Sequence, residues 1–352
     1  MAKQTVILSE NLEQVLTKTI QTIPYDRLFV VCDITTRDLC LPVVKEYKCM
    51  QNASVITLDP GDEHKTLQSV QFVWDKLQQQ GATRHSLAVN IGGGMVTDLA
   101  GFALSTFKRG VSFINIPTTL LAMVDASVGG KTGFNYGGLK NEIGVFSNAA
   151  TVILDTVFLR TLDHHNILSG YAEMLKHGLI YHDDSLLKEL LAFDIEQPDL
   201  VQLGRMVAKS VKVKERIVQE DPHEKGLRKA LNLGHTVGHA FEAMALSKGH
   251  PILHGYAVAF GIICELFLSV MKTGFPVNTM RQVNSFILEH YGRMAFTCDD
   301  YPTLIQLMTH DKKNSGSDIN FTLLHGVGDL ALNQTATKKE IEEALDFFRE
   351  GL

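Results

Sequence analysis

A chain of 352 residues, 45% of them hydrophobic and 20% charged, has enough apolar material for two globular domains. Its net charge of −6 gives no electrostatic case for binding nucleic acid or a membrane surface. The five cysteines show no C-x-x-C spacing, which favours reduced thiols and argues against a cysteine-rich metal site. The N-terminus lacks a signal-peptide core, and no uninterrupted apolar run could span a bilayer, so we expect a cytoplasmic protein.

Short β-branched runs alternate with amphipathic stretches over the first 160 residues, a pattern typical of a doubly wound parallel sheet. The expected strands lie at 27–32, 53–58, 87–91, 111–116 and 151–154, and a helix over 67–80 ends at Gly81. After residue 163 helical periodicity dominates, as over 200–218, 255–271 and 338–348. The sequence therefore predicts an α/β fold, with an N-terminal Rossmann-like parallel-sheet domain over 1–162 followed by an all-α domain over 163–352.

A glycine-rich turn follows the expected strand at 87–91 and precedes an apolar stretch at 99–107 that is typical of a helix. This layout suits a phosphate, because glycines let the backbone approach the anion and the helix N–H groups point at it. The triplet 92–94 departs from the usual dinucleotide pattern, since Thr97 stands where a third glycine would fall. A tight turn that uses glycine only for steric reasons remains the alternative.

A second block with several glycines spans residues 117–141. It matches half of a nucleotide triphosphatase P-loop, but Asp125 occupies the place of the first glycine, so we reject that function. Two glycines let the backbone turn Lys131 inward, while Lys140 and Asn141 add a cation and a neutral donor and acceptor. Lysines gathered in this way favour an anionic substrate, best of all a phosphate, although a solvated loop is the alternative.

The second half of the chain carries metal-ligand residue types. His235 and His239 are four residues apart, on one face of an expected helix, and His254 follows. Upstream, Glu173 and Lys176 are one helical turn apart. Two imidazoles and a carboxylate are a common zinc set that leaves a fourth position open. The spacing does not decide which histidines bind the metal, although His235 is the strongest candidate, and buried structural histidines are the alternative.

These blocks, in this order, resemble the 3-dehydroquinate synthases, a family of sugar-phosphate cyclases. The resemblance runs from residue 59 to residue 314 and is most specific over 92–133, 172–176 and 228–240. The chain departs from the family's usual residues at Asp62, Thr97, Asp163 and Tyr256, none of which is an expected metal ligand. Tyr256 changes the charge beside His254, which makes metal affinity the property most open to change.

The resemblance implies two cofactors. One is a divalent metal ion, zinc or cobalt, held by Glu173, His235 and His254, which leaves His239 on the substrate side. The other is NAD, bound by the first domain. The residues expected to contact NAD are Asp33, Asp62, Lys65, Gly93, Gly94, Asp98, Thr118, Thr119, Lys140, Phe158, Thr161 and Leu162.

The resemblance also implies an anionic sugar-acid phosphate as the small-molecule substrate. The residues expected to contact it are Asp125, Lys131, Lys140, Asn141, Lys176, Arg228, Asn232 and His239, with one or both of Lys312 and Lys313. In the family, the residue that matches Arg109 reaches the phosphate site of the neighbouring subunit. We therefore expect a homodimer.

The implied activity converts 3-deoxy-arabino-heptulosonate 7-phosphate to 3-dehydroquinate and phosphate, in the shikimate pathway to chorismate and aromatic amino acids. The steps are transient oxidation by NAD, phosphate elimination, re-reduction and intramolecular aldol closure, so the enzyme is a carbon–oxygen lyase acting on phosphates. The alternatives are another NAD- and metal-dependent sugar-phosphate cyclase, a metal-dependent polyol dehydrogenase, and a non-catalytic NAD-binding protein. Arg228 and Asn232 match the dehydroquinate pattern and favour the first activity.

Overall fold

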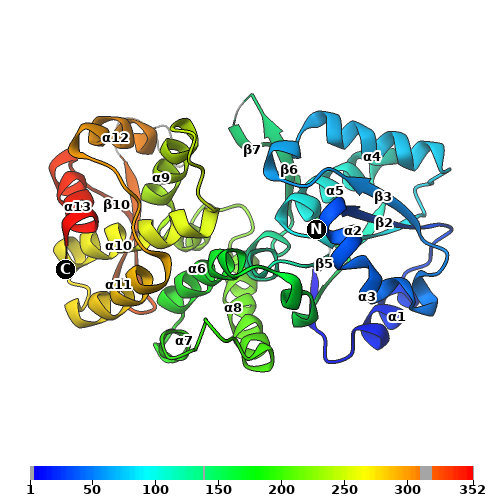
Figure 1. The fold of residues 1–352 in the computed structure, drawn as a ribbon, viewed down its shortest axis with the longest axis horizontal. Coiled ribbons are helices and arrows are strands. Elements are labelled where there is room, and N and C mark those ends of the chain that lie inside the picture. The colour runs from blue at the N-terminus through cyan, green and yellow to red at the C-terminus, as the bar shows by residue number, and fades with distance from the viewer. Residues whose placement is uncertain (1–3, 138, 310–318, 352) are drawn as a thin grey trace. The chain divides into compact units, whose positions relative to one another are not determined.

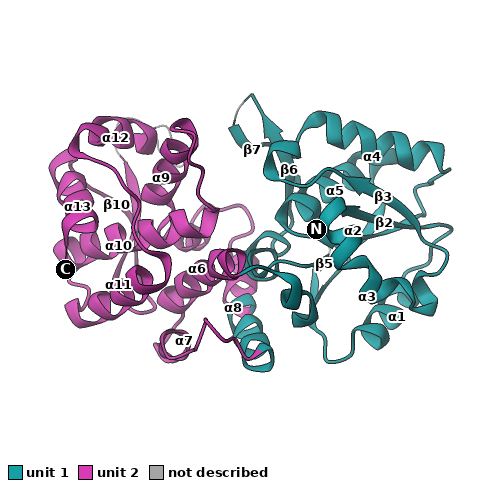
Figure 2. Ribbon diagram, in the orientation of Figure 1, with its two compact units in different colours: residues 1–163, 200–211 teal, residues 164–199, 212–352 magenta. Residues whose placement is uncertain are grey.

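The computed structural model describes residues 4–137, 139–309 and 319–351. The chain forms two compact units, shown in different colours in Figure 2. Unit 1 contains residues 1–163 and 200–211, and unit 2 contains residues 164–199 and 212–352. The helix α8, Leu200–Glu220, therefore contributes to both units, whereas the sequence pattern suggested a single boundary at residue 162.

A six-stranded sheet forms the centre of unit 1, and every neighbouring pair of its strands is parallel. Its order is β1 (Thr5–Leu8), β8 (Thr151–Leu154), β5 (Ser112–Pro117), β4 (Leu87–Gly92), β2 (Leu28–Asp33) and β3 (Ser54–Leu58). Strands β2, β4 and β8 are buried along their whole length, as expected when helices cover both faces. The predicted parallel-sheet fold is confirmed, and the edge strand β1 is an addition to it.

Helices lie on both sides of this sheet, with α1 and α3 on one side and α4 and α5 on the other (Figure 1). The helices that lie wholly in unit 1 are α1 (Leu12–Thr22), α2 (Ile34–Leu39), α3 (Leu41–Lys45), α4 (Leu67–Gln79) and α5 (Gly94–Thr106). Helix α5 begins five residues before the expected position, because the glycine turn itself forms its N-terminus. An antiparallel ribbon of β6 (Lys131–Tyr136) and β7 (Leu139–Phe146) completes the unit.

The chain order of the strands creates a crevice at one place in the sheet. β3 lies on one side of β2, and the chain then crosses back to place β4 on the other side. Ligands of open parallel sheets bind outside the carboxyl ends of the strands at such a switch point. Here those ends are Asp33 of β2 and Gly92 of β4.

Unit 2 is mainly helical. Its helices are α6 (His164–Ile180), α7 (Ser185–Leu191), the second part of α8, α9 (His235–Ser247), α10 (His254–Thr273), α11 (Val277–Tyr291), α12 (Tyr301–Thr309) and α13 (Lys338–Glu350). The helical character predicted for this part is confirmed. It also contains an antiparallel hairpin, β9 (Asn320–Gly326) and β10 (Asp329–Thr335), which the sequence pattern did not predict.

Helix α10 is the central helix of unit 2 and contacts α6, α9, α11, α13 and β9. Among the residues that the structure describes, it is the one helix long and apolar enough to cross a membrane. However, 72% of its apolar window is buried inside the protein. This burial is that of a core helix.

Candidate active site

Three helices of unit 2 bring Glu173, His235 and His254 together. Glu173 lies within α6, while His235 and His254 are the first residues of α9 and α10. The Nε2 atoms of His235 and His254 lie 3.4 and 3.5 Å from Oε1 of Glu173. One ligand atom from each of the three residues falls within 4.8 Å of the others. This arrangement has the donors and the spacing of a three-residue metal centre.

Close helix packing produces this geometry. Gly255 follows His254 at the start of α10, and its N–H donates to Oγ of Ser169 on α6 at 3.1 Å. A Cβ atom on residue 255 would lie 1.8 Å from the carbonyl oxygen of Ser169, so only glycine permits this approach. The close contact fixes the first turn of α10 against α6, the helix that carries Glu173.

The carboxylate of Glu173 is fully buried, and neither of its oxygens has a hydrogen-bond partner within the described residues. Burial raises the pKa of this carboxyl. The Lys176 ammonium and the His235 imidazole lower it by a larger amount, so the pKa lies well below its ordinary value. A buried anion that makes ion pairs but no hydrogen bonds is a poor purely structural element. It is a suitable ligand for a divalent cation.

The imidazole of His254 lies between two carboxylates. Its Nδ1 atom lies 3.3 Å from Oε2 of Glu242, and its Nε2 atom faces Glu173. Burial lowers the pKa of His254, but the two carboxylates outweigh burial and raise the pKa to about 10. The surroundings of His254 thus favour a positive charge at its imidazole.

His239 lies beside this cluster without joining it. Its ring centroid is 5.3 Å from that of His235 and 5.9 Å from that of His254. Among the described residues, the groups with metal-ligand geometry include His235 and His254 but not His239. The position agrees with a side chain that faces substrate, although that role stays a prediction.

Two of the residues that are expected to contact the substrate are buried cations. Lys176 is 1% exposed and forms an ion pair with Glu173, and Arg228 is 3% exposed. An Nη1 atom of Arg228 donates to the carbonyl of Pro222 at 2.9 Å. Asn232 donates through Nδ2 to Oε1 of Glu224 at 3.1 Å. Lys312 and Lys313 lie outside the described residues.

The structure adds two candidates that sequence reasoning did not select. Lys214 of α8 is buried, and it lies in a basic run, 209–216, whose pattern is as typical of a solvated helix face as of the lining of a substrate cleft. Glu224 has φ +57° and holds the side chain of Asn232. The basic run marks the position of Lys214, but only the structure shows that this side chain is buried. The sequence contains no signal for Glu224.

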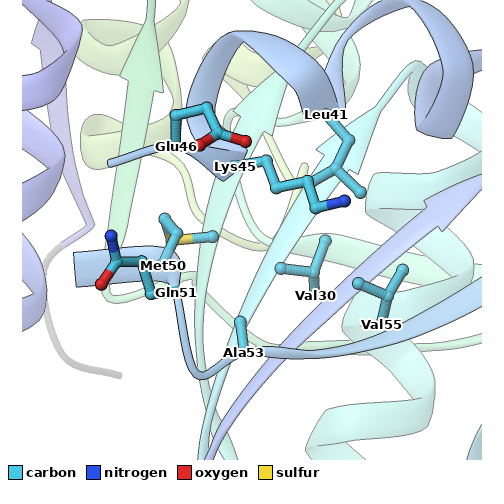
Figure 3. Close-up of a pocket in the computed structure, with 8 residues that line it drawn as sticks. All are labelled: Val30, Leu41, Lys45, Glu46, Met50, Gln51, Ala53 and Val55. Atoms are coloured by element: carbon cyan, nitrogen blue, oxygen red, sulfur yellow. The ribbon is translucent and has the colours of Figure 1, made fainter. Parts of the chain in front are cut away.

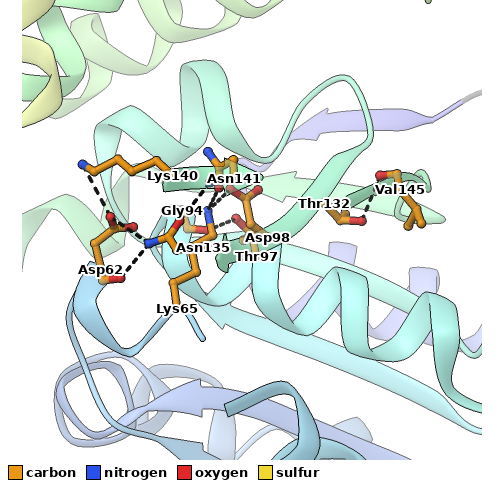
Figure 4. A network of polar contacts seen from close by, with 10 residues as sticks. All are labelled: Asp62, Lys65, Gly94, Thr97, Asp98, Thr132, Asn135, Lys140, Asn141 and Val145. Atoms are coloured by element: carbon orange, nitrogen blue, oxygen red, sulfur yellow. Dashed lines mark hydrogen bonds and ion pairs between the residues drawn. The ribbon is translucent and has the colours of Figure 1, made fainter. Parts of the chain in front are cut away.

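Unit 1 joins five of the predicted residues in one polar network (Figure 4). Nζ of Lys65 lies 2.6 Å from Oδ2 of Asp98 and donates to Oδ1 of Asn141. Nζ of Lys140 lies 3.4 Å from Oδ2 of Asp62. Asn135, which was not predicted, links the two pairs, because it donates to Asp62 and accepts from the backbone N–H of Asn141.

Other predicted nucleotide contacts lie where neighbouring strands end. Asp33 ends β2, Gly93 caps α5 after β4, and Thr118 follows β5 and donates its N–H to the carbonyl of Gly92 at 3.0 Å. Asp33 also has a structural role, since its Oδ1 caps α2 by accepting from the N–H of Thr36 at 2.7 Å. The segment with Phe158, Thr161 and Leu162 follows β8, with the side chain of Phe158 buried. Gly94 and Thr119 complete this set.

Three further predicted residues lie elsewhere in unit 1. Asp125 is part of a π-helical turn, Ala122–Ala126, and Lys131 is the exposed first residue of β6. Arg109 is the last residue of a short turn, Phe107–Arg109, between α5 and β5, and has φ +68°, directly after Lys108 with φ +47°. Their grouping around one ligand stays a prediction.

Unit 1 also has a small cavity of about 220 Å³ beside β2 and β3 (Figure 3). Aliphatic side chains, among them Val30, Leu41 and Val55, dominate its lining, with Lys45 and Glu46 at one side. None of the predicted site residues lines it. It is therefore separate from the glycine turn and from the polar network.

Comparisons with known proteins match both units. The N-terminal and C-terminal models of 3-dehydroquinate synthase match residues 55–169 and 170–314. A 3-dehydroquinate synthase of Parabacteroides distasonis is 51% identical over 351 residues, covering 100% of this chain and 99% of that protein.

Two solved structures have a similar fold. A 2-deoxy-scyllo-inosose synthase complexed with carbaglucose-6-phosphate, NAD+ and Co2+ has a TM-score of 0.85 at 25% identity, covering 99% of this chain and 96% of its own. The 2-epi-5-epi-valiolone synthase of Streptomyces hygroscopicus, with NAD+ and Zn2+ bound, has a TM-score of 0.86 at 25% identity, covering 99% and 98%.

The parallel-sheet unit, the helical unit and the Glu–His–His cluster place the chain in the structural class of these cyclases. Within that class the sequence matches are specific. The chain belongs to the 3-dehydroquinate synthase family.

Proposed function

We propose that this protein converts 3-deoxy-arabino-heptulosonate 7-phosphate to 3-dehydroquinate and phosphate, as a carbon–oxygen lyase. The observation that carries the proposal is the buried carboxylate of Glu173 facing His235 and His254, in a chain half identical to a 3-dehydroquinate synthase over its full length. The family gives the reaction, and the cluster supplies a place for the metal-assisted part of it.

The three residues fit a zinc or cobalt ion, because a buried carboxylate without hydrogen bonds meets two imidazole nitrogens. When bound, the ion would polarise a substrate hydroxyl while NAD takes up and later returns a hydride, so that no net redox change remains. Glu242 orients His254 by contacting Nδ1, which leaves Nε2 toward Glu173. The carbonyl of Leu233 contacts Nδ1 of His235 at 3.1 Å and has the same effect there.

The cationic side chains suit a substrate with a carboxylate and a phosphate. Lys176 and Arg228 are buried, and a charge-assisted bond from a desolvated cation is stronger than one at the surface. Arg228 is held by its own backbone, whose N–H donates to Oδ2 of Asp221 at 3.1 Å. We assign Asn232, His239 and the unit 1 residues Asp125, Lys131 and Asn141 to the same substrate, together with Lys312 or Lys313.

The N-terminus of α5 is the proposed place for the pyrophosphate of NAD. Its cap, Gly93, has no side chain, so that the first N–H groups of the helix are open to an anion. The network of Lys65, Asp98 and Asn141 lies beside the same helix and supplies donors and acceptors. Thr97 is buried and its hydroxyl bonds the carbonyl of Gly94, so the residue that replaces the usual glycine is accommodated within the helix.

Two alternatives remain of interest. Another sugar-phosphate cyclase would share the metal and NAD but use a substrate without a carboxylate, and the buried Arg228 favours the carboxylate-bearing substrate. A polyol dehydrogenase would release NADH.

We further propose that the enzyme is cytoplasmic and works as a homodimer, with Arg109 completing the phosphate site of the partner subunit.

Phosphate release by the purified, metal-loaded protein tests the proposal. We expect release from the heptulosonate phosphate that needs only catalytic amounts of NAD and leaves no NADH absorbance. A carboxylate-free hexose phosphate should release little phosphate. Preference for that substrate would support another cyclase, and stoichiometric NADH would support a dehydrogenase.

A further inference from the structure

Helix α9, which begins with His235, has an N-cap without a side chain. The N-cap is Gly234, with φ +78°, and a Cβ there would lie 2.7 Å from Cγ1 of Ile262 and 2.8 Å from the carbonyl oxygen of Val258. Serine or aspartate, the usual capping residues, therefore do not fit at this position. Because the first N–H groups of a helix have no partner within it, the cap of α9 must come from another element.

Glu265 of α10 supplies that cap. Its Oε2 accepts from the N–H of Gly234 at 2.6 Å, and its Oε1 accepts from those of Thr236 and Val237 at 3.1 and 3.2 Å. The side chain is fully buried. A carboxylate at the positive end of a helix, with hydrogen bonds to both oxygens, is a strong and directional contact.

The capped residues flank His235 on both sides. Residue 234 precedes it and residues 236 and 237 follow it, so the backbone that carries the imidazole is held in place. Nε2 of His235 lies 3.4 Å from Oε1 of Glu173, and a small movement of the first turn of α9 would change that distance. Glu265 itself belongs to none of the metal-ligand groups found among the described residues.

The same helix carries a second ligand directly. Glu265 follows His254 by 11 residues, which is about three helical turns, so both side chains lie on one side of α10. Helix α10 thus presents His254 at its start and holds the start of α9 further along. One rigid helix sets the positions of both histidines.

We infer that Glu265 is a positioning residue of the metal centre, which holds His235 in the geometry needed for a divalent cation. This inference rests on the proposed metal-binding role of Glu173, His235 and His254. It assigns to a buried acidic residue outside the ligand set a direct influence on metal affinity.

Glu265→Gln tests the inference in the full-length protein stripped of metal. The amide is neutral and replaces one acceptor oxygen with a donor, so at least one N–H of α9 loses its partner. We expect the dissociation constant for Co2+, measured by chelator competition, to rise about ten- to a hundred-fold. The visible absorption of bound Co2+ should change as well, while the far-UV circular dichroism and cooperative unfolding of the metal-free protein are retained.

Glu340→Gln is the matched control, because Glu340 caps α13 of the same unit and that helix carries no proposed ligand. It should bind Co2+ like the wild type. If Glu265→Gln does not fold, Glu265→Asp, which keeps the charge but shortens the side chain, should weaken Co2+ binding in the same direction.

Wild-type Co2+ affinity and absorption in a folded Glu265 variant would overturn the inference, as would an equal loss in Glu340→Gln. The metal-site proposal fails separately, if His235→Ala binds Co2+ as tightly as the wild type.

Discussion

The ammonium of Lys176 forms an ion pair with the carboxylate of Glu173 one turn away on α6, and both side chains are buried. The pair lies at the centre of the candidate metal site, because the same carboxylate faces His235 and His254. A buried charge that loses its partner is strongly destabilising. The Lys176 ammonium therefore balances the negative charge of the Glu173 carboxylate when no metal ion is bound.

The first prediction concerns Lys176→Met. Without metal, the variant should be less stable by about 3–5 kcal/mol, because the Glu173 carboxylate stays buried without its ammonium partner. Co2+ should restore most of that stability, since the ion supplies positive charge at the same oxygens. Thermal unfolding with and without Co2+ measures the difference. An equal loss of stability in both conditions would show that metal and lysine act on separate groups.

The second prediction distinguishes the histidines. His254→Ala should lose the metal, because it removes one of two imidazole nitrogens within 3.5 Å of the Glu173 carboxylate. His239→Ala should keep the metal and lose activity. Elemental analysis of both purified variants provides the measurement. Retention of metal by the first variant and loss by the second would reverse the assignment.

Local sequence patterns predicted the buried strands well, because residues such as those of β4 are apolar along their whole length. They did not predict β1, a four-residue edge strand, or the hairpin β9–β10. Each depends on tertiary contacts: β1 pairs with β8, whose residues lie 146 positions away along the chain. Such pairing leaves little local signal.

The candidate site likewise combines features that the sequence predicts with features that depend on tertiary contacts. The spacing of His235 and His239 marks a shared helix face but does not decide between them. The family resemblance assigns His235 and His254 to the metal, and the packing of α6, α9 and α10 brings these two imidazoles to Glu173. The structural role of Asp33 as the cap of α2 was likewise invisible in the sequence. Residue types and their order predict the chemistry, whereas spacing alone does not choose among equivalent side chains: that choice needs a family resemblance or the packing.

The third prediction is that Lys131 serves the substrate and not the fold. It is exposed at the start of β6, after two glycines with φ +100° and +68°. Lys131→Ala should remove a charge-assisted bond worth about 1.5–3 kcal/mol, which lowers kcat/KM about ten- to a hundred-fold or more. The melting temperature and metal content should change little. Unfolding with normal specific activity of the folded fraction would identify a structural role.

The fourth prediction concerns acid stability. The Lys272 ammonium and the Thr337 backbone N–H lower the pKa of Glu340 from its ordinary 4.5 to about 2. Ionised Glu340 therefore stabilises the folded protein above pH 4.5, and this contribution is lost as the pH falls from 4.5 toward 2. Glu340→Gln should be about 0.5–2 kcal/mol less stable at pH 7 and approach the wild type in acid.

Thermal unfolding at several pH values between 7 and 3 measures that convergence. Glu343→Gln on the same helix is the control, since its ion pair with Lys339 is longer, at 3.7 Å, and exposed. It should differ little from the wild type throughout. A gap between Glu340→Gln and the wild type that stays constant down to pH 3 would assign the effect to packing.

The last prediction concerns Arg109. Lys108 and Arg109 both have positive φ, +47° and +68°, and such backbone strain in residues other than glycine is more frequent at functional sites. If Arg109 completes the site of the partner subunit, Arg109→Ala and His254→Ala should each be inactive alone. Unfolded and refolded together in equal amounts, they should recover roughly a quarter of wild-type activity, because half of the dimers are mixed and each has one complete site of two. Native mass spectrometry verifies that mixed dimers form. Mixed dimers without activity would show that Arg109 acts within its own subunit.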